Sequence, residues 1–370
     1  MIATPSIASL SRPTYSVPDV NRLKRSFPGR HWPSYEEGRR RLQRPEKAKE
    51  YFHKAMGFAI KTSKKDAPSF ANFMGVDLGE GGHYREALLF FEKALKIDPK
   101  YAPAWNNKGA ALYNLGRYEE AITCYEKALE IDPNYTQAWN NKGVALNGLG
   151  RYEEAITCCD RAMELDPKYA SALSNKGWAL NDLGRYDEAI TCCEKALGLD
   201  PKCVGAWNNK GVALYKLGRY KEAIEEYQEA LKLNRDLPEC HINLAVLLSV
   251  TNRHDEVERE FREALRLFKE KKPKKLEEAL RYLEKELETH YDSHSLWRAK
   301  AEFLKALGRD TEVQQSMERA EVLEGLEIPD IEHDIVVKML PPIETWRVVK
   351  AKVKHLGRAT PRVVIDLVED

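Results

Sequence analysis

The sequence lacks several features that would assign it to familiar functional classes. No apolar run approaches the length needed to cross a bilayer, and residues 1–21 hold no continuous apolar segment of the signal-peptide kind. The formal net charge of the 370 residues is only +1, so the whole molecule has no field that attracts nucleic acid or membrane. We therefore expect a cytoplasmic protein with reduced thiols and no membrane partner, and any electrostatic role must come from a local patch.

Signatures of a metal site, a cofactor site or a catalytic centre are also missing. The seven cysteines include no Cys-x-x-Cys pair, and the nine histidines show no zinc-ligand spacing. A glycine-rich phosphate loop and a Gly-x-Ser-x-Gly turn are absent. We expect no catalytic residue, metal, cofactor or small-molecule substrate. Stacking of repeats could bring equivalent cysteines such as Cys124 and Cys158 together, but free cysteine more often serves as a small apolar core residue.

What the sequence does contain is an internal period of 34 residues. The phrase Trp-Asn-Asn-Lys-Gly begins at Trp105 and returns at Trp139 and Trp207, and a variant with Leu-Ser in place of Trp-Asn begins at Leu173. A second phrase, Leu-Gly-Arg-Tyr, keeps the same spacing (Leu115, Leu149, Leu183, Leu217). A fixed period of this length is typical of repeat proteins, in which each unit is one supersecondary element.

Each unit reads as two helices joined by a short turn. In the second half of one unit, Tyr118, Ala121 and Tyr125 follow the spacing of one helix face. Gly116 lies between the halves, where a helix commonly ends in the left-handed conformation, and Pro133 ends the second helix. One helix pair cannot bury both of its faces alone, so successive pairs are expected to stack into an elongated body.

These residues resemble the tetratricopeptide repeat family over about residues 68–325. The resemblance implies an all-α fold, a right-handed superhelical solenoid, to which the C-terminal residues are expected to add a small β appendage. It assigns six tandem repeats (68–101, 102–135, 136–169, 170–203, 204–237, 238–271). One departure recurs, because a lysine replaces the usual leucine before the glycine (Lys108, Lys142, Lys176, Lys210). The long lysine stem can still pack while its charge reaches water.

Four further segments complete the predicted organisation. Residues 1–44 are basic and Pro-rich and are expected to be disordered or draped over the first repeats, and residues 45–67 form a capping helix. Residues 272–327 are degenerate repeat helices. Residues 328–370 form a small module in which 335–337, 347–355 and 363–368 are β-branched or alternating, as in strands. So small a sheet needs a partner, which is either the last helices, a second copy of the chain or a bound strand.

An asparagine recurs at one position of five successive repeats (Asn107, Asn141, Asn175, Asn209, Asn243). The family resemblance implies that this position faces the concave groove, where an amide can pair with both the N–H and the C=O of an extended peptide. We call these five residues the asparagine ladder. The alternative is a polar residue on a solvated helix face, copied by duplication of the repeat.

Three aromatic residues are candidate anchors for a partner in the same groove. Trp178 stands where neighbouring repeats have alanine or valine, and Tyr113 and Tyr215 lie one turn along the first helix of their own repeats. A large aromatic side chain in a groove is a natural binding hot spot. For Trp178 the alternative is structural, because Leu173 replaces the usual tryptophan in the same repeat.

The leading hypothesis is therefore a non-catalytic scaffold that binds a protein or peptide partner in the groove. The runner-up is a nucleic-acid-associated regulator, based on the basic residues of 22–49 and the Lys-rich C-terminal strands. Self-association through a solenoid end or the C-terminal strands stays open.

Overall fold

The computed structural model describes residues 13–16, 36–37, 40, 45–251, 253–271, 275–324, 335–337 and 349–351. In this part of the chain the helices form pairs. The first helices of the pairs are α4 Ala67–Glu80, α6 Ala102–Asn114, α8 Thr136–Gly148, α10 Ala170–Asp182, α12 Val204–Lys216, α14 Pro238–Val250 and α17 His294–Ala306. The second helices are α5 Tyr84–Ile97, α7 Tyr118–Ile131, α9 Tyr152–Leu165, α11 Tyr186–Leu199, α13 Tyr220–Leu233, α15 His254–Lys271 and α18 Asp310–Glu324. Helix α3 Pro45–Thr62 precedes the pairs, and α16 Leu276–Thr289 stands between α15 and α17.

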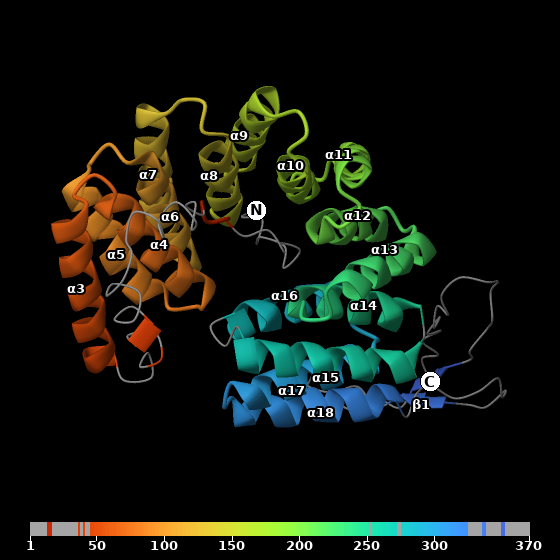
Figure 1. Ribbon diagram of the computed structural model, residues 1–370. Helices are drawn as coiled ribbons and strands as arrows, with labels where there is room; N and C mark the ends of the chain where they lie inside the picture. Colours follow the sequence, from red (N-terminus) through yellow and green to blue (C-terminus); the bar gives the residue numbers. More distant parts are fainter. Residues whose placement is uncertain are drawn as a thin grey trace.

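The pairs stack into a curved array, which Figure 1 shows from α3 through α9 and α12 to α18. First helices of consecutive pairs contact one another, and each second helix packs against its own first helix and the first helix of the next pair. The array is thus an all-α solenoid, as the repeat pattern predicts. The first helices carry the asparagine ladder, so their arrangement positions the candidate site.

Glycine and proline set the ends of the helices within each unit. Gly116 has a φ of +80°, which lets the N–H of Arg117 donate to the carbonyl of Leu112 at 3.0 Å and close the first helix. Glycines with positive φ recur at the same place (Gly82, Gly150, Gly184, Gly218, Gly308). Asp132, which precedes Pro133, is extended with φ −134° and ends the second helix.

Close packing inside a pair depends on a glycine of the first helix. A Cβ on Gly109 would lie 2.6 Å from the ring of Tyr125, which is fully buried. In the next repeat Gly143 faces the smaller Cys159, whose Sγ would lie 3.2 Å from such a Cβ. Cys159 is therefore a core residue in the place of a tyrosine, as its position in the repeat predicts.

The recurrent lysines tie each repeat to the one before it. The Nζ of Lys142 lies 2.8 Å from the carboxylate of Glu126 on the preceding second helix, and its side chain is 20% exposed. The same pairing joins Lys108 to Glu92, Lys176 to Asp160 and Lys210 to Glu194. The stem is packed and the charge is paired near water, so the substitution of leucine by lysine is compatible with the repeat.

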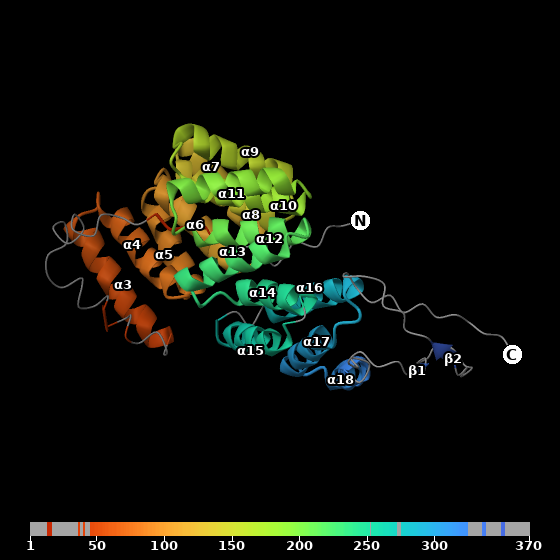
Figure 2. The same ribbon diagram turned by 90° about the vertical axis from the view of Figure 1, so that its right-hand side faces the viewer.

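At the C-terminal end the repeat geometry changes. Helix α16 follows α15 as a single helix, and α17 and α18 then form the last pair. Strands β1 Ile335–Val337 and β2 Val349–Ala351 pair antiparallel with Val336 opposite Lys350, and Figure 2 shows them beyond α18. The third expected strand, 363–368, lies outside the described residues. Within the described helices none is both long and apolar enough to cross a membrane.

Candidate functional site

The asparagine ladder runs along the inner helices α6, α8, α10, α12 and α14. All five side chains are buried, with exposed fractions between 0% for Asn107 and 4% for Asn243. Each ladder amide donates one N–H to the preceding repeat: Asn107 to Asn72, Asn141 to Asn106, Asn175 to Asn140, Asn243 to Asn208, and Asn209 to the carbonyl of Ser174, at 2.7–3.3 Å. Buried, hydrogen-bonded amides differ from polar residues on a solvated face.

This bond between repeats fixes the orientation of each ladder amide. An asparagine side chain has two N–H donors and one acceptor oxygen. With one N–H engaged by the previous repeat, the second N–H and at least one lone pair of the Oδ1 can meet another group, even at Asn107, whose Oδ1 also accepts from the Nδ2 of Asn106 at 3.1 Å. One donor and one acceptor side by side match the N–H and C=O of a single residue in an extended chain.

Two of the ladder amides pair in this way with the chain's own residues 13–16. The Oδ1 of Asn107 accepts from the N–H of Ser16 at 2.7 Å, and its Nδ2 donates to the Ser16 carbonyl at 2.9 Å. The Oδ1 of Asn141 accepts from the N–H of Thr14 at 3.0 Å, and its Nδ2 donates to the Thr14 carbonyl at 2.9 Å. Figure 1 shows this short red segment on the inner side of the curve, beside α8.

The register is one ladder asparagine for every second residue of the segment. Alternate residues of an extended chain point to the same side, so Thr14 and Ser16 face the ladder together. The segment runs opposite to the repeats, because its later residue meets the earlier repeat. The side chain of Thr14 is held as well, since its Oγ1 accepts from the Nε2 of Gln137 at 2.6 Å.

Tyr15 lies between these two residues and its side chain enters the first repeat. Its ring stacks on Phe91 of α5 with centroids 6.1 Å apart and an interplanar angle of 26°. On α4, a Cβ at Gly79 would lie 2.5 Å from the phenol oxygen. Burial raises the pKa of Tyr15, with smaller contributions from Tyr84 and Glu80, and the described part of the chain offers its phenol oxygen no hydrogen-bond partner.

Comparison with known families matches five tetratricopeptide repeat models to residues 78–101, 102–135, 134–202, 174–238 and 214–271. Together they cover residues 78–271 without a gap, which is more than half of the sequence. The chain belongs to the tetratricopeptide repeat family. It therefore has the fold of a protein-interaction scaffold.

Solved tetratricopeptide repeat structures are similar to parts of the chain. A tetratricopeptide repeat protein from Parabacteroides merdae is 15% identical, with a TM-score of 0.52 over 64% of this chain and 93% of its own. A thermophilic TPR protein of Thermus thermophilus, TTC0263, is 23% identical over 49% and 98%, with a TM-score of 0.45. YrrB, described as a TPR protein with an unusual peptide-binding site, is 26% identical over 50% and 95%, with a TM-score of 0.39. No curated protein sequence matches this chain.

Two predicted aromatic anchors are packed within the tetratricopeptide array. Trp178 is 2% exposed, and its indole N–H donates to Asp182 at 2.7 Å, so a partner would have to displace covering atoms to reach its ring. Tyr113 is half-buried and lies against Tyr118 with ring centroids 5.0 Å apart. That either residue binds a partner stays a prediction.

Tyr215, the third predicted anchor, is covered by α16. Its hydroxyl donates to the Oε2 of Glu286 at 2.7 Å, and the Nζ of Lys216 lies 3.1 Å from the other oxygen of that carboxylate. Leu280 and Leu283 of α16 belong to the same buried cluster as Tyr215. Helix α16 therefore already occupies the surface that Tyr215 would offer to a partner.

Two inner asparagines that the sequence analysis did not single out also join repeats. Asn147 donates to the backbone carbonyl of Asn175 at 3.0 Å, and Asn181 donates to that of Asn209 at 2.8 Å. Both occupy the repeat position of Tyr113 and Tyr215, so the 34-residue spacing itself was the available signal. They hold consecutive ladder residues at a fixed separation.

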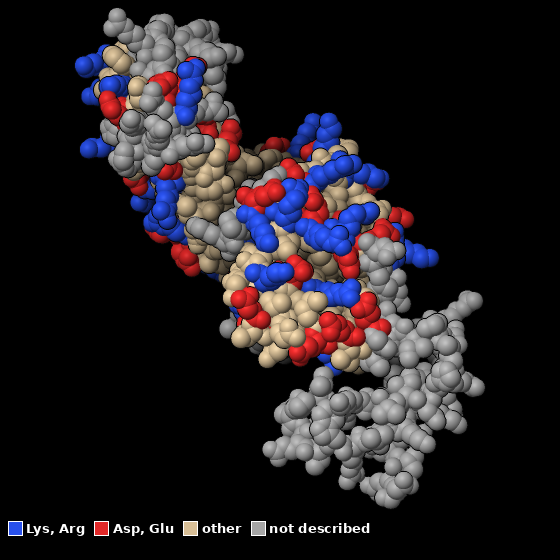
Figure 3. All heavy atoms as spheres, turned by 90° about the horizontal axis from the view of Figure 1, so that it is seen from below, with Lys and Arg blue, Asp and Glu red and all other residues tan. Residues whose placement is uncertain are grey.

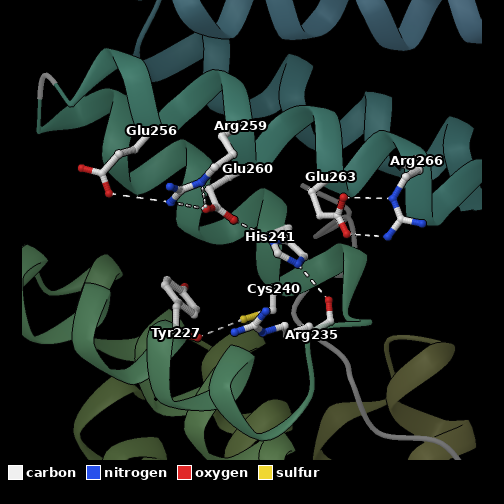
Figure 4. Close-up of polar contacts among 9 residues, drawn as sticks. All are labelled: Tyr227, Arg235, Cys240, His241, Glu256, Arg259, Glu260, Glu263 and Arg266. Carbon is white, nitrogen blue, oxygen red and sulfur yellow. Dashed lines mark hydrogen bonds and ion pairs between the residues drawn. The ribbon is translucent and has the colours of Figure 1, made fainter.

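A buried ionic cluster joins α14 to α15, as Figure 4 shows. His241 contacts the carboxylate of Glu260 through Nδ1 at 2.6 Å and the carbonyl of Arg235 through Nε2 at 2.9 Å. Arg259 donates to the other oxygen of Glu260 at 2.9 Å. Burial alone would raise the pKa of Glu260, but the hydrogen bonds from His241 and Arg259 outweigh it, and the pKa is lowered.

Four of the five cysteines on the second helices are buried core residues, and Cys192 is partly buried. Burial raises the pKa of Cys124 and of Cys158 to about 11, so both thiols stay protonated near neutral pH. A metal ligand or a nucleophile needs the thiolate. Among the residues that the structure describes, no group of three His, Cys, Asp or Glu side chains is placed to hold a metal ion.

Proposed function

We propose that this protein is a non-catalytic scaffold that holds an extended segment of a partner protein against its inner helices. The asparagine ladder forms hydrogen bonds with the main chain of that segment. The observation that supports this most is the pair of two-bond contacts that Asn107 and Asn141 make to residues 13–16. These contacts use only main-chain groups of the segment. The same ladder can therefore accept segments of different sequence, provided that they are extended.

The bonds in this contact join neutral groups, so binding should depend only weakly on salt. Binding to a nucleic-acid backbone would instead weaken steeply as salt rises. On the face in Figure 3 positive and negative side chains are interspersed. Most of the basic stretch 22–49, on which the nucleic-acid hypothesis was based, lies outside the described residues.

The test uses a fluorescent nine-residue peptide that copies residues 11–19, titrated against the full chain and followed by fluorescence anisotropy. N-methylation at the residue equivalent to Thr14 or Ser16 removes an N–H that the ladder accepts. N-methylation at the residue equivalent to Tyr15 removes an N–H with no ladder contact and is the matched control.

We expect each of the first two methylations to weaken binding by about tenfold, since each removes a buried hydrogen bond of about 1–2 kcal/mol. The control peptide should bind within about twofold of the unmodified one, and binding should persist on raising the salt. Equal affinities for all three methylated peptides would refute recognition through the ladder. An affinity that collapses with salt would favour the nucleic-acid or electrostatic alternative.

A further inference from the structure

We propose that residues 13–16 are a built-in competitor for the groove, and that the partner they exclude is an extended segment with an aromatic side chain at the position of Tyr15. This inference rests on the proposed function, since it names the partner class of the same groove. It is carried by three features: the shape of the Tyr15 subsite, its register with the ladder, and the way in which the segment is held.

The Tyr15 subsite is formed by a local departure from the repeat. The position of Gly79 in the first repeat is filled by Tyr113, Asn147, Asn181 and Tyr215 in the next four. A Cβ on Gly79 would meet three atoms of Tyr15 at 2.5–3.0 Å, and these are its three nearest contacts outside its own helix. Gly79 thus creates the space that the phenol ring fills, and Phe91 stacks on that ring.

The subsite favours an aromatic side chain that carries no charge. A flat ring stacks on Phe91, and an aliphatic side chain would leave part of the space between Phe91 and Gly79 empty. A negative charge is unfavourable here, because burial, and to a smaller extent Tyr84 and Glu80, raise the pKa of Tyr15. Because the phenol oxygen has no hydrogen-bond partner among the described residues, phenylalanine fits the subsite at least as well as tyrosine.

The subsite and the ladder act on adjacent residues of one segment. Asn141 and Asn107 bind the residues before and after Tyr15. The ring therefore stacks on Phe91 only when the main chain of the segment is in register with the asparagine ladder. A partner must meet both requirements at once. Its recognition element is a central aromatic residue whose two neighbours offer free N–H groups, which excludes proline at both.

The segment is held as a ligand would be held. Its contacts include four ladder bonds, the Gln137 bond to Thr14 and the Tyr15 ring, and in the sequence residues 17–44 connect it to the first long helix. A tethered ligand acts at an effective concentration of the order of millimolar. A free peptide must therefore compete with it.

The experiment measures binding of the fluorescent 11–19 peptide to the full-length wild type and to the Tyr15→Ala variant. Removal of the ring from the tethered copy should release the groove, so Tyr15→Ala should bind the peptide at least about tenfold more tightly than wild type. A peptide with Phe at the Tyr15 position should bind at least as tightly, and one with Ala should bind at least about tenfold more weakly.

Gly79→Ala tests the subsite directly, and Gly198→Ala is its matched control. Both glycines are the last but one residue of a helix, α4 or α11, and a Cβ on Gly198 would meet no atom within 4 Å. Combined with Tyr15→Ala, Gly79→Ala should weaken peptide binding at least about tenfold, and Gly198→Ala should leave it unchanged. Circular dichroism checks that each variant keeps its helix content.

The outcomes separate this inference from the proposed function. Equal peptide affinity of wild type and Tyr15→Ala overturns the competitor but leaves the peptide groove standing. A peptide affinity that changes neither with Gly79→Ala nor with replacement of the aromatic residue of the peptide overturns the aromatic subsite. Absence of binding to every variant overturns the proposed function itself. A concentration-dependent dimer that Tyr15→Ala abolishes means that the segment lies in the groove of a second copy, which overturns the intramolecular competitor.

Discussion

The contact between His241 and Glu260 is the most completely buried ion pair that the structure describes, with both side chains about 10% exposed or less. Both ring nitrogens of His241 face oxygen acceptors, the Glu260 carboxylate and the Arg235 carbonyl. The imidazole ring therefore joins Glu260 of α15 to α14 and to the main chain just before α14.

We predict that His241→Ala lowers the free energy of unfolding by about 3 kcal/mol at pH 7, because it leaves the Glu260 carboxylate buried with only Arg259 beside it. Because the pKa of Glu260 is lowered in the folded protein, ionised Glu260 stabilises the fold at pH values above the ordinary pKa of glutamate. This stabilisation is lost as the pH falls through the lowered pKa of the folded state. The difference between variant and wild type should thus begin to shrink as the pH falls below about 4. Urea unfolding at pH 7 and at a series of lower pH values measures it.

The control for this prediction is Glu120→Gln. Glu120 also has a pKa lowered by a hydrogen bond from an arginine, Arg117, but its side chain is exposed. Exposed pairs of this kind contribute little. If Glu120→Gln destabilised the protein as much as His241→Ala, or if the effect of His241→Ala did not change with pH, the stabilising role assigned to ionised Glu260 would be wrong.

Gly109 gives a second prediction at the scale of one residue. A methyl group there would lie 2.6 Å from the buried ring of Tyr125, so Gly109→Ala should destabilise the protein by about 1–3 kcal/mol. Gly198→Ala, in open space within α11, should instead stabilise it by up to about 1 kcal/mol through helix propensity. Thermal unfolding of both variants compares the two, and shifts of the same sign would contradict the packing argument.

At the scale of helices, α16 shows where tertiary contacts override the repeat. Its sequence predicts an amphipathic helix over 276–289, which the structure has, but an apolar face does not specify its neighbour. The neighbour is the surface around Tyr215, reached through Glu286, a residue 71 positions away in the sequence. No 34-residue pattern encodes this contact, because α16 has no counterpart in the earlier repeats.

Tyr215→Phe tests the docking of α16. The substitution removes the O–H that donates to the buried Glu286, which keeps its bond from Lys216. We expect a loss of about 1–3 kcal/mol in the free energy of unfolding and faster amide exchange in α16. Tyr113→Phe, the same substitution at the same position of an earlier repeat, is the control. Equal exchange in α16 for both variants would argue against the Glu286 bond as the element that holds this helix.

The helix pairs themselves follow from local signals. A positive φ at Gly116 and an extended residue before Pro133 end the helices where the sequence places these residues, and the ladder position lies on the inner helices. The Tyr15 subsite could not be found in that way, because it joins residues 64 positions apart. Its only sequence signal is Gly79, a glycine inside a helix at a position where the other repeats have larger side chains.

At the scale of the whole molecule, residues 13–16 connect three repeats. Tyr15 contacts α4 and α5, while Ser16 and Thr14 bond to α6 and α8. In a solenoid each repeat otherwise contacts only its neighbours, so stability is close to a sum of local terms. The segment adds a contact that spans more than one interface.

We therefore predict that Tyr15→Ala increases amide exchange in α4, α6 and α8 and leaves α14 and α17 unchanged. Release of the segment should loosen the interfaces that it spans and no others, because coupling along a solenoid passes between neighbours. Hydrogen exchange read out by mass spectrometry on wild type and variant measures this. A uniform increase along the whole array would indicate general destabilisation, and no change at all would show that the segment does not stiffen the first repeats.

The register between segment and ladder turns the array into a molecular ruler. One repeat of 34 residues advances the bound main chain by two residues, so five ladder positions would measure a segment of about nine or ten residues. Duplication of a repeat would then add two residues to the recognised length and leave the chemistry of each step unchanged. On this view the copy number of the repeat determines how long a segment the protein can select.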